Sequence, residues 1–253
     1  MSQHTGLTVS QRFTEGQILL LKKPYGWTSF DLVRKVRNLL SRQLGVKKLK
    51  VGHAGTLDPL ATGLMLLCTG KATKMIEELQ DGEKDYRAIL QLGATTPSFD
   101  LETQIDQNFP TDHITFEMVK ATIGGFVGET EQVPPLFSAI KIEGKRAYEH
   151  ARKGEHRELK PRTVVIRNID IAEFSQTQLK LTITCGKGTY IRSLARDIGI
   201  SLGSGAYLSA LERTRIGPYH LDNARTPAEF EEFLQNEVVE AKNVIESMDV
   251  NIK

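Results

Sequence analysis

The chain has 253 residues, of which 40% are hydrophobic and 25% charged, and its formal net charge is +2. A chain of this size buries a substantial core, and its near-neutral charge neither requires nor excludes a polyanionic partner. Two cysteines and six histidines without ligand spacing argue against a disulfide framework or a zinc site, and no apolar run approaches the ~20 residues that span a bilayer.

The N-terminal part of the chain predicts a strand followed by a helix. Ile18 to Leu21 is a short apolar run that ends before turn residues, as in a buried strand. Thr28, with Asp31 three residues later, is a variant of the capping box that starts helices. Apolar residues then recur at helical spacing, namely Phe30, Leu32, Val33, Val36, Leu39 and Leu40.

The next segment combines a glycine-rich stretch with further strand and helix signals. A strand is expected near Val51, and the three glycines and one proline of Gly52 to Gly63 predict an ordered loop. A helix is expected to begin around Leu64, with helical spacing again from Ala72 to Leu79. The alternation from Tyr86 to Leu92 predicts a strand.

The C-terminal half adds two strands and two helices to this pattern. Thr115 to Ile123 has helical spacing, whereas Val164 to Ile171 and Leu179 to Cys185 alternate as half-buried antiparallel strands do. Helical spacing returns from Thr189 to Ile200. The expected fold class is therefore α+β, with a mixed, largely antiparallel sheet and flanking helices. We expect an N-terminal tail at 1–15, a main domain at 16–225 and a short acidic helical appendage at 226–253.

Charge is unevenly distributed along the chain. From Pro227 onward there are seven acidic residues and two lysines. The segment between Leu32 and Leu57 has no acidic residue and seven cations, which are Arg34, Lys35, Arg37, Arg42, Lys47, Lys48 and Lys50. Such a run is usually the solvated face of a helix, but it also suits contacts with phosphate groups.

Several familiar sites are absent from the sequence. The segment from Gly63 to Thr73 has six residues between its glycines, and Ala72 stands where a P-loop needs Ser or Thr. Gly203 and Gly205 lack the third glycine of a dinucleotide-binding turn. No cofactor and no metal are expected.

Asp58 stands out because Pro59 follows it and glycines flank the loop. The proline favours an extended backbone at Asp58, which fixes the direction of its carboxylate. An Asp-Pro pair in such a loop is, however, usually a structural turn. The spacing alone leaves both interpretations open.

Five segments in sequence order resemble TruB-type pseudouridine synthases, and the resemblance extends from about Gly16 to Tyr219. Two form the family's paired signature, and three match its later segments. They are KPYGWTSFD (23–31), GHAGTLDPLATG (52–63), KDYRAILQLG (84–93), QVPPLFSAIKIEGKRAYEHARKGE (132–155) and CGKGTYIRSLARDIG (185–199). The resemblance implies the pseudouridine synthase fold and the isomerisation of uridine 55 in the T arm of tRNA, after the base has flipped out of the RNA.

The resemblance also assigns roles to residues. It implies that Asp58 is the catalytic carboxylate, which either attacks the sugar or removes a sugar proton, and that Arg192 keeps Asp58 ionised. Tyr86 would stack on the target base and assist proton removal from it. The resemblance places His53 in contact with RNA, and Tyr190 and Leu211 in the base pocket.

Each of these residues also has an ordinary structural interpretation. Tyr86, Tyr190 and Leu211 could be packing residues, and His53 could be a loop histidine. Arg192 could be a solvated cation or a local partner for nearby acids. Lys23, on the loop after the first strand, is expected near the site or on the ordinary surface.

The sequence departs from the family pattern in two places. Only 34 residues follow Tyr219, too few for the PUA-type RNA-binding domain with which many members end. The segment TTPSFDLET (95–103) keeps Asp100 but lacks the glycine that usually follows.

We expect a stand-alone cytoplasmic enzyme that is a monomer without an obligate protein partner. Three other functions are alternatives to it. A noncatalytic RNA-binding or RNA-folding protein would not need Asp58 or Arg192. A glycoside hydrolase would need a second acid beside Asp58. A relative that works with guide RNA and partner proteins would be expected to carry an additional assembly domain.

Overall fold

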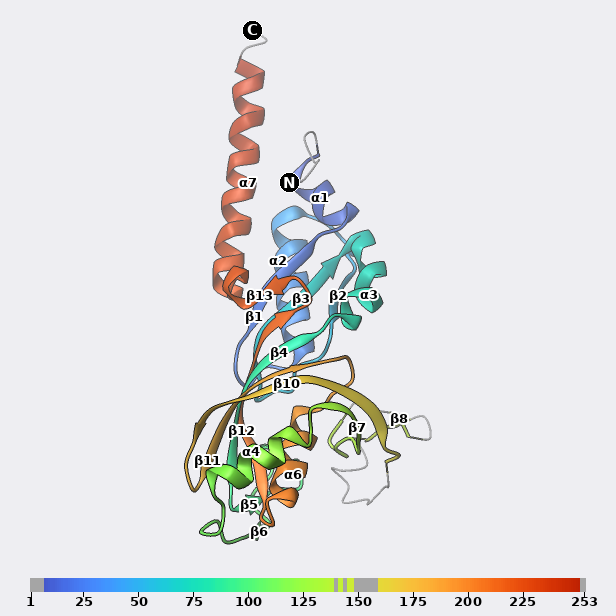
Figure 1. Cartoon of the computed structure of the whole chain (residues 1–253). Helices are drawn as coiled ribbons and strands as arrows, with labels where there is room; N and C mark the ends of the chain where they lie inside the picture. Colours follow the sequence, from blue (N-terminus) through green and yellow to red (C-terminus); the bar gives the residue numbers. More distant parts are fainter. Residues whose placement is uncertain (1–6, 139–140, 143–144, 148–158, 251–253) are drawn as a thin grey trace. The chain divides into compact units, whose positions relative to one another are not determined.

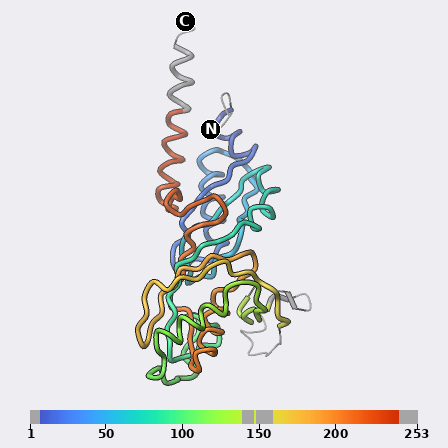
Figure 2. Tube along the Cα trace, in the orientation of Figure 1, coloured from blue at the N-terminus to red at the C-terminus, as the bar shows by residue number. Residues whose placement is uncertain are grey.

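The structure is a computed structural model that describes residues 7–138, 141–142, 145–147 and 159–250 (Figure 1). The chain forms two compact units, residues 1–82 with 213–253 and residues 83–212. Figure 2 shows the resulting discontinuity of unit 1, in which the blue N-terminal part of the chain lies together with the red C-terminal part. Among the described residues, no helix combines the length and apolar character needed to cross a membrane.

Unit 1 begins with helices and strands from the N-terminal part of the chain. Their order is α1 (Val9–Glu15), β1 (Ile18–Lys23), α2 (Ser29–Leu44), β2 (Val51–Ala54), β3 (Thr62–Thr69), the 3-10 helix η1 (Gly70–Met75) and α3 (Ile76–Asp81). After unit 2, it continues with the end of β12 (Ala206–Ile216), β13 (Tyr219–His220), the 3-10 helix η2 (Leu221–Asn223) and α7 (Pro227–Val250). Both β1 and β2 pair antiparallel with β3.

The expected helix at Leu64 is wrong, because Thr62 to Thr69 form strand β3. The strand is buried on both faces, and β1 and β2 pair with it on either side. An apolar run of this length does not distinguish a buried strand from a buried helix. The pairing of β3 with the neighbouring strands of the sheet decides the outcome. Helical structure begins at Gly70 instead, as η1 and then α3.

Helix α2 confirms the start signal in the sequence. The Thr28 side chain accepts a hydrogen bond from the Asp31 backbone N–H at 3.0 Å, and the Asp31 carboxylate accepts one from the Thr28 backbone N–H at 3.0 Å. The apolar residues buried by the helix are Leu32, Val33, Val36, Leu39 and Leu40, whereas Phe30 is 59% exposed. The helix ends before Gly45, which is left-handed.

Unit 2 is built on an antiparallel sheet with the strand order β12-β4-β11-β10-β7. The strands that precede β12 are β4 (Lys84–Leu92), β7 (Gly128–Gln132), β10 (Arg162–Phe174) and β11 (Gln178–Cys185). Among the described residues of this unit, the helices are α4 (Phe116–Gly124) and α6 (Ile191–Ser201). Short antiparallel pairs are formed by β5 (Ala94–Thr95) with β6 (Gln107–Asn108) and by β8 (Lys141–Ile142) with β9 (Lys145–Arg146).

The antiparallel pairing of β10 with β11 and of β11 with β4 confirms the three strands expected from alternation. The mixed α+β fold class is likewise confirmed. The expected domain limits remain a prediction. Residues 1–15, expected as a tail, include α1, whose start carries a capping box at Thr8. Part of the segment 132–155, one of the five that carry the family resemblance, lies outside the described residues.

Candidate active site

Asp58 lies on a short loop, residues 55–61, that connects β2 to β3 in unit 1. The loop starts at Gly55, whose φ of +93° is unfavourable for any residue with a side chain. Within the loop, the Ala61 backbone N–H donates to the Asp58 carbonyl at 3.1 Å and closes a tight turn around Pro59. The predicted ordered loop is thus confirmed, and it begins after β2 rather than at Gly52.

The start of α2 holds this loop from one side. The Ser29 side chain is buried and makes two hydrogen bonds to Leu57, accepting from its N–H at 2.9 Å and donating to its carbonyl at 2.9 Å. The Gly26 N–H donates to the Pro59 carbonyl at 2.9 Å. The two halves of the paired signature, 23–31 and 52–63, are therefore joined by direct hydrogen bonds.

Lys23 is the last residue of β1 and is only 1% exposed, so its interpretation as an ordinary surface lysine is wrong. Its Nζ donates to the carbonyls of Pro24 at 3.1 Å, Trp27 at 2.6 Å and Pro59 at 3.1 Å. Burial is the main cause that lowers the pKa of Lys23 from 10.5 to about 8, although the Asp58 carboxylate raises it and the Arg213 guanidinium lowers it further.

Arg213, on β12, is a second buried cation, and sequence reasoning missed it. Its side chain is 1% exposed. The guanidinium donates from Nε to the Leu64 carbonyl at 2.8 Å and from Nη2 to the Gly55 carbonyl at 3.0 Å. The sequence signal that could have drawn attention to it is its position two residues after Leu211, within the part of the chain that resembles the family.

His53 lies on β2, opposite Leu67 of β3. Burial lowers its pKa below 6.5, and the positive charge of Arg213 lowers it further, so the ring is neutral at pH 7. Within the described chain, its Nδ1 atom is buried and has no hydrogen-bond partner. The described residues contain no group of three or more His, Cys, Asp or Glu side chains that could hold a metal ion.

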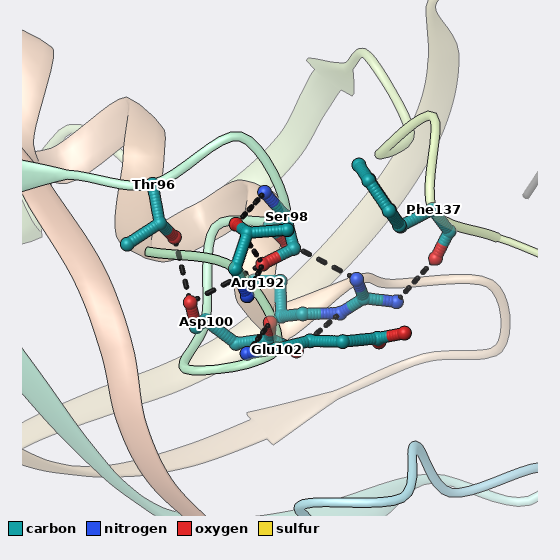
Figure 3. A network of polar contacts seen from close by, with 7 residues as sticks. Thr96, Ser98, Asp100, Glu102, Phe137 and Arg192 are labelled. Carbon is teal, nitrogen blue, oxygen red and sulfur yellow. Dashed lines mark hydrogen bonds and ion pairs between the residues drawn. The ribbon is translucent and has the colours of Figure 1, made fainter. Parts of the chain in front are cut away.

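Arg192 lies in the first turn of α6 in unit 2 and is 3% exposed. Figure 3 shows its guanidinium between two loops, where Nη1 donates to the Ser98 carbonyl at 3.1 Å and Nη2 to the Phe137 carbonyl at 2.8 Å. Its Nε lies 3.6 Å from a carboxylate oxygen of Asp100, which is itself 4% exposed. The solvated-cation interpretation of Arg192 is therefore wrong, whereas its interpretation as a partner for nearby acids agrees with the contact to Asp100.

The Asp100 loop has a fixed shape despite the missing glycine. Phe99 adopts a φ of +61°, a conformation that glycine would take without strain. The Thr96 hydroxyl donates to the Asp100 carbonyl at 2.7 Å, and the Glu102 N–H donates to the Asp100 carboxylate at 2.9 Å. These local bonds, together with Arg192, set the conformation that the sequence left open.

The other expected site residues of unit 2 lie on three separate elements. Tyr86 is on β4, opposite Ile183 of β11, and is 7% exposed. Tyr190 precedes α6, and its backbone N–H donates to the Gln132 side chain at 2.8 Å. Leu211 is on β12. The expected partners Asp58 and Arg192 belong to different units, and their pairing remains a prediction.

Part of the cation-rich segment is neutralised within unit 1. Glu231 of α7 pairs with Lys35 at 2.8 Å and with Arg42 at 3.0 Å, and Arg34 pairs with Asp31 at 2.8 Å. In the described part of the chain, the exposed side chains of three lysines have no ion pair, and these are Lys47, Lys48 and Lys50. Any phosphate contact of this segment would therefore centre on its C-terminal end.

Comparison with protein families yields two matches that together extend over most of the chain. Residues 41–191 match the TruB family pseudouridylate synthase N-terminal domain, and residues 192–252 match the tRNA pseudouridylate synthase B C-terminal domain. Among curated proteins, tRNA pseudouridine synthase B of Parabacteroides distasonis is 59% identical over 90% of this chain and 97% of its own length. The protein of the same name from Flavobacterium johnsoniae is 51% identical over 89% of this chain and 99% of its own length.

Solved structures show the same fold. A chain from a crystal structure of a Cbf5-Nop10-Gar1 complex superposes with a TM-score of 0.68 and 25% sequence identity. The match covers 92% of the present chain but 61% of that chain, so the present chain spans about three fifths of the solved one.

Proposed function

The chain belongs to the TruB family of pseudouridylate synthases, and we propose that it converts uridine 55 in the T loop of tRNA to pseudouridine, with Asp58 as the catalytic carboxylate. It is a pseudouridine synthase, and its high-identity relatives are tRNA pseudouridine synthases. The observation that supports the role of Asp58 is the loop itself, whose backbone is held by two buried cations, Lys23 and Arg213.

The reaction exchanges one bond between base and sugar for another. The bond from N1 of uracil to C1′ of the ribose breaks, the base rotates within the site, and C5 bonds to C1′. The proton on C5 then leaves and N1 gains a proton, so the product is an isomer of the substrate. A carboxylate can begin this sequence by attacking C1′ or by removing the neighbouring 2′ proton.

The remaining site residues have complementary roles in this proposal. Tyr86 stacks on the extruded base and assists proton removal at C5, because a flat aromatic side chain matches the face of a flipped base. Arg192 pairs with Asp58 and keeps it ionised in a site that excludes water. Tyr190 and Leu211 line the base pocket. His53, neutral and flat, stacks against the T loop where the uridine has left.

The tRNA backbone supplies most of the affinity in this proposal. The exposed lysines Lys47, Lys48 and Lys50 lie just before β2, which leads into the Asp58 loop. Cations placed there would contact T-stem phosphates, and phosphate contacts give folded RNA much of its sequence-independent binding. We further propose that the protein works in the cytoplasm as a monomer, without a cofactor or an obligate protein partner.

The test uses tRNA labelled with tritium at C5 of its uridines, since the isomerisation releases this hydrogen to water. The wild-type protein should release tritium, and carbodiimide primer extension should map the product to position 55. Asp58→Asn should lower the single-turnover rate on the order of 10³-fold or more while tRNA still binds. Asp222→Asn, which changes an exposed carboxylate of unit 1, serves as the matched control and should retain wild-type activity.

The same experiment distinguishes the alternative of a noncatalytic RNA-binding protein. That alternative would give tight tRNA binding without tritium release from folded wild-type protein. Tritium release that persists in Asp58→Asn would still support a pseudouridine synthase but would reject Asp58 as its catalytic carboxylate.

A further inference from the structure

Arg213 has contacts unlike those of most buried arginines. Its guanidinium is 1% exposed and bonds to three backbone carbonyls, those of Gly55 at 3.0 Å, Thr56 at 3.4 Å and Leu64 at 2.8 Å. Within the described part of the chain, no carboxylate forms a salt bridge with it. A buried cation is costly unless its N–H groups are satisfied, so these carbonyls are what makes the position tolerable.

The two loop carbonyls that accept hydrogen bonds from Arg213 are part of a continuous series of hydrogen-bonded carbonyls. Each of the five consecutive residues from Gly55 to Pro59 has its backbone carbonyl bonded to a donor from another residue. Arg213 donates to the carbonyls of Gly55 and Thr56, and the Ser29 hydroxyl donates to that of Leu57. The Ala61 N–H donates to the Asp58 carbonyl, and both Lys23 and the Gly26 N–H donate to the Pro59 carbonyl. Buried cations therefore fix the loop on both sides of Asp58, with Arg213 before it and Lys23 after it.

The two glycines that flank the loop fit this arrangement. A Cβ atom at Gly63 would lie 2.3 Å from the Arg213 carbonyl oxygen and 2.6 Å from its backbone nitrogen, so glycine is needed for β3 to approach β12. A Cβ atom at Gly55 would lie 3.5 Å from Nη1 of Arg213, an ordinary contact distance. The glycine at 63 thus makes room for the backbone of Arg213, while its side chain turns toward the loop.

We propose that Arg213 is a positioning residue for catalysis, which holds the backbone of the Asp58 loop and thereby sets the direction of the catalytic carboxylate. The inference rests on the role proposed for Asp58. The planar guanidinium donates from Nε and from both Nη atoms in fixed directions, whereas a lysine ammonium is a compact charge on a flexible stem. Lysine at 213 would keep the charge and lose the simultaneous hold on Gly55 and Leu64.

The test compares Arg213→Lys with Arg225→Lys. Arg225 belongs to the same unit, and its guanidinium lies over the Phe233 ring at 4.2 Å. Its backbone hydrogen bonds are to Leu20 and Lys22 of β1 and not to the Asp58 loop. In Arg213→Lys the single-turnover rate should fall about 100-fold, since a misplacement of 1 Å at a catalytic group has this order of effect. The Kd for tRNA should stay within about threefold of wild type, as expected when an interaction is lost only in the transition state. Arg225→Lys should retain the wild-type rate.

Amide hydrogen exchange provides a readout that does not depend on activity. The backbone N–H groups of Leu57 and Ala61 should exchange faster in Arg213→Lys, while amides in the centre of β3 keep their protection. A wild-type rate with unchanged exchange at these two amides would overturn the proposal. So would a loss of rate matched by an equal loss of protection throughout unit 1, because Arg213 would then act only through global stability.

A measurement on the wild-type protein covers the case in which Arg213→Lys does not fold. The Nε–H of Arg213 should be protected from exchange and show a scalar coupling across its hydrogen bond to the Leu64 carbonyl. Rapid exchange of this N–H would refute the proposed hold on the loop. Asp58→Asn separates the two proposals, because full activity of that variant rejects the role of Asp58 while the exchange results still report on the loop.

Discussion

The buried ammonium of Lys23 should make the stability of the protein depend on pH above about pH 8. The pKa of Lys23 is lowered from 10.5 to about 8, with burial as the largest cause. Below about pH 8 both the folded and the unfolded chain hold this proton, so the full cost of burying the charge is present. Between about pH 8 and 10.5 the unfolded chain binds more protons, so the contribution of Lys23 to stability rises with pH.

The size of this effect follows from the difference between the two pKa values. Each pH unit in the range corresponds to about 1.4 kcal/mol. From the pKa of about 8 in the folded state and 10.5 in the unfolded state, the free energy of unfolding should gain roughly 2 to 3 kcal/mol between pH 7 and pH 10. Methionine does not titrate, so Lys23→Met lacks this gain. The unfolding free energy of wild type minus that of Lys23→Met should therefore become more positive by the same amount between about pH 7 and pH 10.

Urea unfolding of wild type, Lys23→Met and Lys23→Arg at pH 7 and pH 10 measures the effect. Arginine stays charged throughout this range, so Lys23→Arg should share the pH trend of Lys23→Met while differing from it in absolute stability. NMR titration of the Lys23 side-chain Cε resonance gives its pKa directly. A midpoint near 10.5, together with a difference between wild type and variants that does not change with pH, would refute the reasoning.

Three further predictions concern other contacts. Gly63→Ala should destabilise the protein by more than 2 kcal/mol in urea unfolding, because the φ of Gly63 is +105° and a Cβ would overlap the β12 backbone. The control Gly45→Ala should lose about 1 kcal/mol, because Gly45 has a φ of +66° and open space around it. Equal losses of stability in the two variants would contradict the prediction. Asp100→Asn should lower stability by about 3 kcal/mol, because it breaks a buried ion pair with Arg192, and a thermal melt like that of wild type would count against it. Glu231→Gln should free Lys35 and Arg42 of α2 from their ion pairs. The variant should therefore bind tRNA severalfold more tightly at low salt, and its Kd should depend more steeply on salt concentration. An unchanged salt dependence would exclude phosphate contacts by these two cations.

Much of the fold could be read from local patterns in the sequence. Alternation predicted the strands that include Tyr86 and Ile183, since residues on one face of a strand repeat with period two. The start of α2 at Thr28 was predictable because a capping box involves only residues three apart. Helix α4 was predictable from another local pattern, the helical spacing between Thr115 and Ile123.

The apolar run from 62 to 69 shows where local patterns stop being informative. Its residues suit a buried helix as well as a buried strand, and only pairing with β1 and β2 decides between them. Likewise, the cations of α2 looked largely unpaired because no acidic residue lies between Leu32 and Leu57. Its neutralising acid, Glu231, is 189 residues from Arg42 along the chain.

The sequence by itself indicated the family and singled out Asp58 as the candidate catalytic residue, because both depend on residues close together in short motifs. Only the tertiary structure decided how the Asp58 loop is held. Lys23 and Arg213 are polar residues that a sequence pattern assigns to the surface, since burying a charge is unfavourable unless its N–H groups find acceptors. Those acceptors are backbone carbonyls of other segments, and every residue type has a backbone carbonyl, so no pattern of side chains could reveal them.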